Sequence, residues 1–255
     1  MPIYGSKVTE RVSADYPGCL SRAVSMVGTS RFVTGNLSYA NVAKSATFDV
    51  DMGSDEINAF AGREGSQLGI WVMGGLVHWM TAAAVVATEL VNGTSVGRCR
   101  KMLSWMCRYR ETVNASFVSR MCRKFGISTE GYFTQKLDSM LTLMFSAIVA
   151  HELGHLCLGH VERMDGGVDM FGADRNDERQ ADLFAASVLQ SFGSGRNGAV
   201  AAVMTFASLS YSRGDIYDGE FTHPGDRERI QNMLNAFAAD LDGGKPSAED
   251  LRKLL

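Results

Sequence analysis

Apolar residues along most of this chain are three and four positions apart, a spacing that places them on one face of an α-helix. The spacing predicts helices over residues 76–91, 137–164, 177–192, 199–210 and 231–239. Two short apolar runs have the length of β-strands and are joined by a turn-rich stretch: residues 56–60 and 68–73, with the turn at 62–66. The first 50 residues are weakly periodic and predict a helix with a strand or two. We therefore expect a mainly helical chain with a small sheet.

Residues 68–88 contain no Asp, Glu, Lys or Arg, so this segment is long enough to span a bilayer. Three glycines and His78 interrupt it, and Ile70-Trp71-Val72-Met73 suits a strand. The pattern favours a buried strand that runs into a buried helix, with a membrane span as the alternative.

Residues 93–136 differ from the rest of the chain in charge. They carry nine Lys and Arg residues against two acids, Glu111 and Glu130, while apolar residues recur among them at helical spacing. The pattern predicts an inserted helical pair with a solvated basic face. The alternative is a docking surface for an acidic partner, an anionic membrane surface or nucleic acid.

Composition limits the class of protein. The 255 residues are 45% hydrophobic with a net charge of −3, which suits one soluble domain over residues 1–255 and gives no reason to expect specific nucleic-acid binding. Five cysteines without a CxxC pair favour a reducing compartment over a disulfide framework and make a cysteine zinc site improbable. The start of the chain has no charged-then-apolar signal segment. We therefore expect a cytoplasmic protein, with membrane association as the alternative.

The motif with the clearest chemistry is His151-Glu152-Leu153-Gly154-His155, at the end of the apolar run 141–150. Positions four apart share a helical face, so both imidazoles point the same way and can hold one zinc ion. Glu152 is then placed to take a proton from a water that the metal activates. The H-E-x-x-H spacing therefore predicts a zinc-dependent peptidase.

A catalytic zinc usually has a third protein ligand, and the best candidate is Glu178. Glu178 and Asp182 are four apart on one helical face, where inward-facing carboxylates need a positive partner. Asp182 is then expected to accept the outer N–H of a ligand imidazole. His160 lies five residues after His155, which would turn it about 140° away on a continuous helix, so a structural role is expected.

A further block, Thr222-His223-Pro224, is followed by Arg229-Ile230. Pro224 favours a turn before a helix. Peptide hydrolysis develops an oxyanion, so a donor besides the metal is useful, and His223 or Arg229 can supply it.

Four blocks in order along the chain carry a family resemblance: Asn58-Ala59-Phe60 with Gly75-Leu76, His151 to His155, Glu178 to Asp182, and Thr222-His223-Pro224 with Arg229-Ile230. Together they resemble the HtpX / CaaX-prenyl-protease family of zinc metallopeptidases, across about half of the chain. The resemblance implies His151, His155 and Glu178 as zinc ligands, Glu152 as the base, and His223 and Arg229 near the oxyanion or the ligands. It also implies that Asn58 binds substrate backbone.

The resemblance also implies an α+β, mainly helical, zincin-like fold with a small sheet. Its edge strand, around residues 69–73, would flank the cleft and pair with an extended protein or peptide substrate. The chain departs from the family in its basic insertion, so the CaaX substrate is not carried over.

Two other functions remain open on the sequence. The first is a cytosolic protease that cleaves a regulator, of the kind that inactivates phage repressors. The second is a non-catalytic binding module with a structural zinc, although a structural site needs no base such as Glu152.

Overall fold

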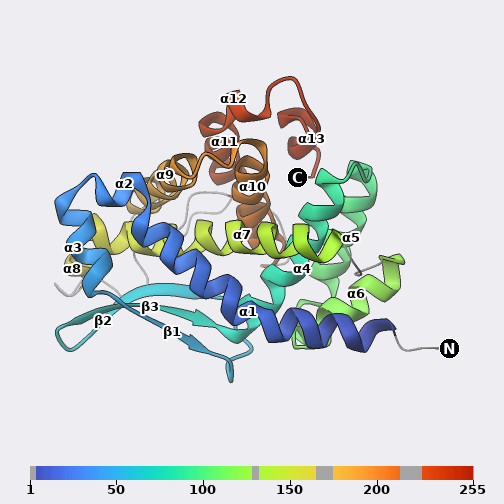
Figure 1. Cartoon of the computed structure of the whole chain (residues 1–255), viewed down its shortest axis with the longest axis horizontal. Helices are drawn as coiled ribbons and strands as arrows, with labels where there is room; N and C mark the ends of the chain where they lie inside the picture. Colours follow the sequence, from blue (N-terminus) through green and yellow to red (C-terminus); the bar gives the residue numbers. More distant parts are fainter. Residues whose placement is uncertain (1–3, 128–131, 165–174, 213–225, 255) are drawn as a thin grey trace.

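The computed structural model describes residues 4–127, 132–164, 175–212 and 226–254. It is a mainly helical α+β fold with one small mixed sheet, as the sequence predicts. In Figure 1 the long helix α7 (Tyr132–Cys157) runs through the middle of the molecule, with the sheet below its yellow end and α9, α10 and α11 above it.

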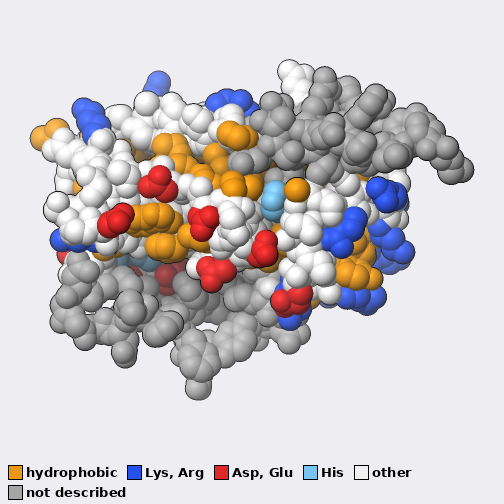
Figure 2. Space-filling view, turned by 90° about the horizontal axis from the view of Figure 1, so that it is seen from below, with side chains coloured by type: hydrophobic (Ala, Val, Ile, Leu, Met, Phe, Trp, Pro, Cys, Tyr) orange, Lys and Arg blue, Asp and Glu red, His pale blue; other side chains and the backbone are white. Residues whose placement is uncertain are grey.

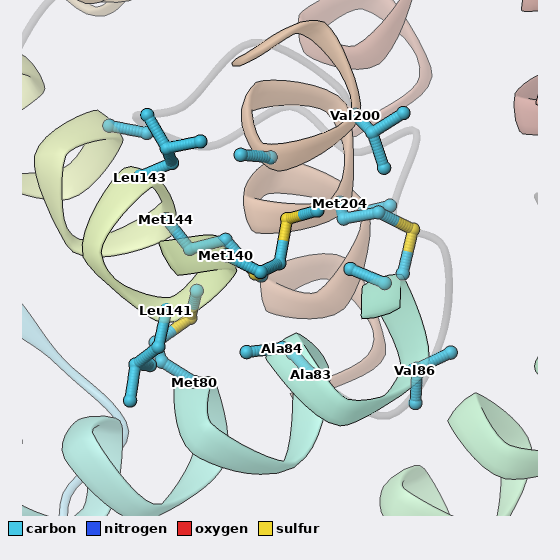
Figure 3. Packing of buried hydrophobic residues seen from close by; sticks show 14 of the residues in the cluster. Met80, Ala83, Ala84, Val86, Met140, Leu141, Leu143, Met144, Val200 and Met204 are labelled. Carbon is cyan, nitrogen blue, oxygen red and sulfur yellow. The ribbon is translucent and has the colours of Figure 1, made fainter. Parts of the chain in front are cut away.

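Helix α7 is the central element because it is apolar on nearly all sides from Leu137 to Leu156. Its neighbours are α1 (Tyr4–Thr29), α4 (Gly74–Val91), α9 (Arg175–Ser191) and α10 (Gly195–Ser212). Figure 3 shows Leu141 and Met144 of α7 packed against side chains of α4 and α10. Burial of these side chains fixes the axis of the helix that carries the two motif histidines.

The sheet has three strands in the order β1-β3-β2: β1 (Thr47–Asp51), β2 (Ala59–Glu64) and β3 (Gln67–Met73). β3 pairs in parallel with β1 and in antiparallel with β2. The expectation that residues 69–73 form the edge strand is therefore wrong, because both sides of β3 are hydrogen-bonded. β2 is the edge strand that lies next to α7.

Strand boundaries also differ from the prediction. β2 begins at Ala59, whereas residues 56–60 were expected, and the turn is confined to Gly65 and Ser66. Gly65 has a φ of 62°, which glycine adopts without strain, so the hairpin can close over two residues. The predicted strand-to-helix transition within residues 68–88 is confirmed, with β3 leading directly into α4.

The predicted helix over residues 137–164 is two helices. α7 ends at Cys157, Gly159 adopts a φ of 72°, and α8 (His160–Met164) starts afresh. The apolar periodicity continues across this break, which is why it did not reveal the end of α7.

The basic segment 93–136 contains α5 (Val96–Arg108), the 3₁₀ turn η1 (Arg110–Thr112) and α6 (Phe117–Phe125). Both helices send side chains into the main core, among them Met102, Met106, Phe117 and Met121. They pack on α1, α4 and α10, so the described part of this segment belongs to the domain core.

The remaining helices are α2 (Arg31–Thr34), α3 (Leu37–Ser45), α11 (Asp226–Ala236), α12 (Ala238–Leu241) and α13 (Ala248–Arg252). A capping box of Ser247 and Asp250 starts α13.

Two helices, Gly74–Val91 and Gln135–Cys157 within α7, are long and apolar enough to cross a membrane by length and composition. The apolar windows of these helices are 83% and 94% buried inside the protein, which is also typical of core helices, so they are weak support for a membrane span.

Candidate active site

The site forms where α9 lies against the end of α7. Gly154 has no side chain at this contact, and a Cβ there would lie 3.1 Å from the Phe184 Cβ and 3.2 Å from the Ala181 Cα. Small residues at positions 154 and 181 therefore let the two helices approach closely. The close approach brings Glu178 of α9 to the motif histidines of α7.

The metal-binding atoms of three buried side chains, His151, His155 and Glu178, lie close together and form what we call the donor triangle. The His151 and His155 Nε2 atoms are 3.2 Å apart. The Glu178 Oε2 lies 3.4 Å from the His151 Nε2, and the Glu178 Oε1 lies 3.5 Å from the His155 Nε2. Bonds of about 2.0–2.1 Å from one tetrahedral zinc ion would separate its ligand atoms by about 3.3 Å. The nearest contacts have about this length, with the two Glu178 contacts made by different oxygens, so the buried His151-His155-Glu178 cluster could hold a metal ion.

The buried charges around this triangle fit a divalent cation. Glu152, Glu178, Asp182 and Arg229 are all buried together with the two imidazoles. With neutral imidazoles and ionised carboxylates, the three acids and the one arginine have a net charge of −3 + 1 = −2. Uncompensated buried charge is costly, and a divalent cation would cancel it.

The pKa values reflect the same imbalance. Burial lowers the pKa of His151, but hydrogen bonds to Asp182 and Glu178 outweigh burial and raise it to about 10. Burial raises the pKa of Glu152 to about 7. Burial, with the neighbouring His151, lowers the pKa of His155 to about 3. Protons on His151 and Glu152 thus supply positive charge that a bound cation would replace.

The outer nitrogen of His151 faces a fixed carboxylate. Its Nδ1 lies 3.0 Å from the Asp182 Oδ1. Arg229 donates to both Asp182 oxygens, from Nε at 2.9 Å and from Nη2 at 2.6 Å. Arg229 also lies over the Phe206 ring, 4.6 Å from its centre. This bidentate pair holds Asp182 in place, and Asp182 in turn orients the His151 imidazole.

The outer nitrogen of His155 faces a third histidine. The His155 and His160 Nδ1 atoms are 3.0 Å apart, and the His160 Nε2 lies 3.6 Å from the Asp177 Oδ1. His160 is not part of the donor triangle. It reaches the outer side of His155 because the chain breaks at Gly159, rather than turning about 140° away along one helix.

Glu152 lies beside a cavity of about 270 Å³ that His151 also lines. Its carboxylate accepts a backbone hydrogen bond from Ala61 of β2. Asn58, Ala59 and Arg229 line the same cavity. The cavity thus brings the motif glutamate, the edge strand and the buried guanidinium together.

Most of the site residues that the sequence predicts lie together in the structure, and one of them lies outside the described residues. His151, Glu152, His155, Glu178, Asp182 and Arg229 form one buried cluster, and Asn58 lies on the cavity wall. His223 lies outside the described residues.

Several cavity residues carry no sequence signal of function. Apolar side chains from four elements or segments line the cavity: Ile57, Leu76, Ile148, Phe206 and Leu209. Each lies in or near an ordinary apolar stretch, so only the fold shows that they face Glu152.

The fold and site together define a helical protein with a buried two-histidine, one-glutamate cluster beside a cavity. Residues 133–246 match the family model of Peptidase U49, which supports the prediction of a peptidase. The match does not support the more specific resemblance to the HtpX / CaaX-prenyl-protease family. No curated protein and no solved structure matches the chain.

Proposed function

We propose that this protein is a zinc-dependent endopeptidase in which His151, His155 and Glu178 hold the ion. The observation that carries the proposal is the donor triangle, in which the two Nε2 atoms are 3.2 Å apart and the nearest Glu178 oxygens lie 3.4 and 3.5 Å from them. Two imidazoles and one carboxylate form a donor set typical of catalytic zinc. The bound ion would supply a Lewis acid that polarises the peptide carbonyl and lowers the pKa of water.

Glu152 is the general base in this proposal. Its carboxylate lies in the cavity beside His151, and the Ala61 N–H orients it. Burial brings the pKa of Glu152 to about 7, which suits a base that takes up a proton and releases it at neutral pH.

Arg229 and Asn58 are proposed to bind the substrate. Two bonds to Asp182 fix the guanidinium at the cavity wall, so its other N–H groups can donate to a carbonyl oxygen that gains charge. Asn58 immediately precedes the edge strand and lies on the same wall. His223 remains a predicted donor to the oxyanion.

The edge of β2 is proposed to pair with the substrate backbone. The Asn58 carbonyl accepts from the Met73 N–H at 3.0 Å, so the backbone groups of Ala59, Ala61 and Arg63 point away from β3. The Ala61 N–H accordingly reaches Glu152. An extended peptide added along this edge would pass the cavity that holds the base.

Metal content and peptidase activity of matched variants test the proposal. Glu178→Ala should lose zinc because a third of the donor set is gone. Glu152→Gln should keep zinc and lose activity by about 10²–10⁴-fold, the usual contribution of a positioned base. Zinc is measured by elemental analysis and activity on an unfolded protein such as casein.

Glu162→Gln is the control, because Glu162 is an exposed glutamate near the site whose side chain pairs with Arg63. It should keep both zinc and activity. Full activity in Glu152→Gln would eliminate the proposed mechanism, and zinc retained by Glu178→Ala would show that Glu178 is not the third ligand.

A further inference from the structure

The outer face of the sheet carries an aromatic surface that no part of the described chain covers. Phe60 of β2 and Trp71 of β3 pair across the strands and stack, with ring centres 5.4 Å apart and planes 17° from parallel. Phe60 is 43% exposed and Trp71 is half-buried. Two stacked rings on a solvent-facing sheet are unusual, because aromatic side chains of this size are mostly buried.

The Trp71 ring lies flat because glycines stand beneath it. A Cβ on Gly69 would lie 2.7 Å from the ring atom Cη2, and one on Gly62 would lie 3.3 Å from Cζ3. Both glycines neighbour each other across β2 and β3. Because neither glycine has a side chain, the Trp71 indole can lie along the sheet and present one broad π-face to solvent.

The surroundings of this aromatic pair are acidic. Asp49 of β1 pairs with Trp71 of β3, and Asp51 is the next residue of β1 on the same face. Glu64 lies on the same face of β2 as Phe60, nearer the hairpin turn. Strand alternation puts residues 47, 49, 51, 60, 62, 64, 67, 69 and 71 on the outer face, and none of them is Lys or Arg. Figure 2 shows the face from below, with hydrophobic side chains surrounded by Asp and Glu over the sheet.

This surface is continuous with the proposed cleft, because β2 contributes to both. Ala59 lines the cavity, while Phe60 and Glu64 project from the outer face of the same strand. A peptide paired with the edge of β2 would place alternate side chains on that face, about 5 Å from the β2 side chains. The group that best satisfies a π-face flanked by carboxylates is a guanidinium, which stacks on rings and pairs with carboxylates in one plane.

We propose that the part of the outer face nearest the open edge of β2 (Phe60, Trp71 and Glu64) binds arginine side chains at alternate positions of the polypeptide substrate. Asp49 and Asp51 lie on β1, beyond β3, and add negative potential without touching the peptide. The inference rests on the proposed function and narrows its substrate class to segments with arginine two residues apart. The acidic surface selects against substrates with Asp or Glu at those positions.

Binding measured without cleavage tests this inference. Glu152→Gln protein is titrated with short fluorescein-labelled peptides that carry two arginines at alternate positions, or lysine or glutamate in their place. Fluorescence anisotropy should show the arginine peptide binding most tightly. Phe60→Ala should weaken it about two- to fivefold through the lost stacking, and Glu64→Gln should weaken it about twofold or more.

The matched control is Glu111→Gln, which removes the same charge from a glutamate elsewhere whose side chain is 82% exposed. This control should bind the arginine peptide as tightly as the parent.

The outcomes separate this inference from the proposed function. If the wild-type protein cleaves no peptide but binds the arginine peptide through the outer face, the inference is supported and the proposed peptidase function is rejected. Cleavage with the same KM for arginine and glutamate peptides, unchanged by Phe60→Ala, overturns the inference and leaves the peptidase intact. Self-association that is lost in Glu64→Gln, without any effect on peptide binding, also overturns the inference in favour of a second copy of the chain.

Discussion

At the residue scale, the two histidines of the cluster differ in the groups that hold their outer nitrogens. His151 faces the carboxylate of Asp182, which Arg229 fixes, whereas His155 faces the imidazole of His160. For His155 to bind a metal through Nε2, its Nδ1 must carry the proton, so the His160 Nδ1 must accept. His160 is therefore expected to orient His155 through an acceptor at this atom.

Substitutions of His160 test this role. His160→Asn keeps an acceptor close to the position of Nδ1 and should keep most of the zinc affinity. His160→Leu removes the acceptor and should weaken zinc binding about tenfold or more, the usual effect of losing such a partner. The measurement is competition with a chelator of known affinity.

Thermal unfolding of the metal-free proteins serves as the control, because His160 is fully buried. Similar midpoints for the two variants, with different zinc affinity, would support orientation of His155. Equal zinc affinity in both variants would leave His160 a packing role alone.

At the element scale, the decisive contact is the approach of α7 and α9. Gly154 occupies the variable position before the second motif histidine, where the H-E-x-x-H pattern requires no particular residue. The structure shows why a glycine suits this chain, because any Cβ there would lie 3.1 Å from Phe184 and 3.2 Å from Ala181. The distance between the two helices in turn sets the distance from Glu178 to the histidines.

Gly154→Ala should therefore push the two helices apart by a few tenths of an ångström. We expect a loss of about 1–3 kcal/mol of stability, as for other overpacked contacts, together with weaker zinc binding. Chemical denaturation and zinc titration measure the two effects.

Gly97→Ala is the matched control, since nothing lies within 4 Å of a Cβ on this helical glycine of α5. It should be neutral or stabilise by up to about 1 kcal/mol through helix propensity. A Gly154→Ala protein as stable as Gly97→Ala, with unchanged zinc affinity, would show that the helices can yield without moving Glu178.

The elements themselves were largely predictable, and their ends were not. Apolar periodicity found α4, α7, α9 and α10 because burial of one face dictates the spacing of apolar residues. It missed the break at Gly159, because α8 continues the apolar pattern, and it shifted β2 by three residues. It could not order the strands, since pairing depends on which segments meet in space.

At the scale of the whole molecule, charge is segregated along the chain. Residues 93–136 carry a net +7 (nine basic against two acidic residues), so the rest of the chain carries −3 − 7 = −10. Figure 2 shows Lys and Arg gathered at one end of the face and Asp and Glu over the sheet. The α5–α6 end is thus a separate basic surface on an acidic protein, and an acidic partner or anionic membrane remains its predicted target.

The basic end should bind anionic vesicles in spite of the negative net charge. Co-sedimentation with phosphatidylserine vesicles is expected at low salt and should be lost near about 0.2 M salt if only screened charge is involved. Arg123→Gln with Lys124→Gln, exposed on α6, should weaken it, whereas Lys44→Gln with Lys253→Gln should not. Equal loss in both pairs would mean that binding follows total charge rather than this surface.

The sequence by itself determined the helical character of the chain and the chemistry of its centre. Periodicity is local, and so is the i, i+4 spacing that puts His151 and His155 on one face, so both can be read without a fold. The same local rule paired Glu178 with Asp182.

Only the tertiary structure decided how these parts meet, because distances between segments far apart in sequence depend on packing. It set the 3.4 Å between His151 and Glu178, made β2 the edge strand beside Glu152, and turned His160 towards His155. It also joined Trp71, Phe60 and Asp49, from three separate strands, into one surface. No local pattern encodes such contacts, since each depends on how α7, α9 and the sheet pack together.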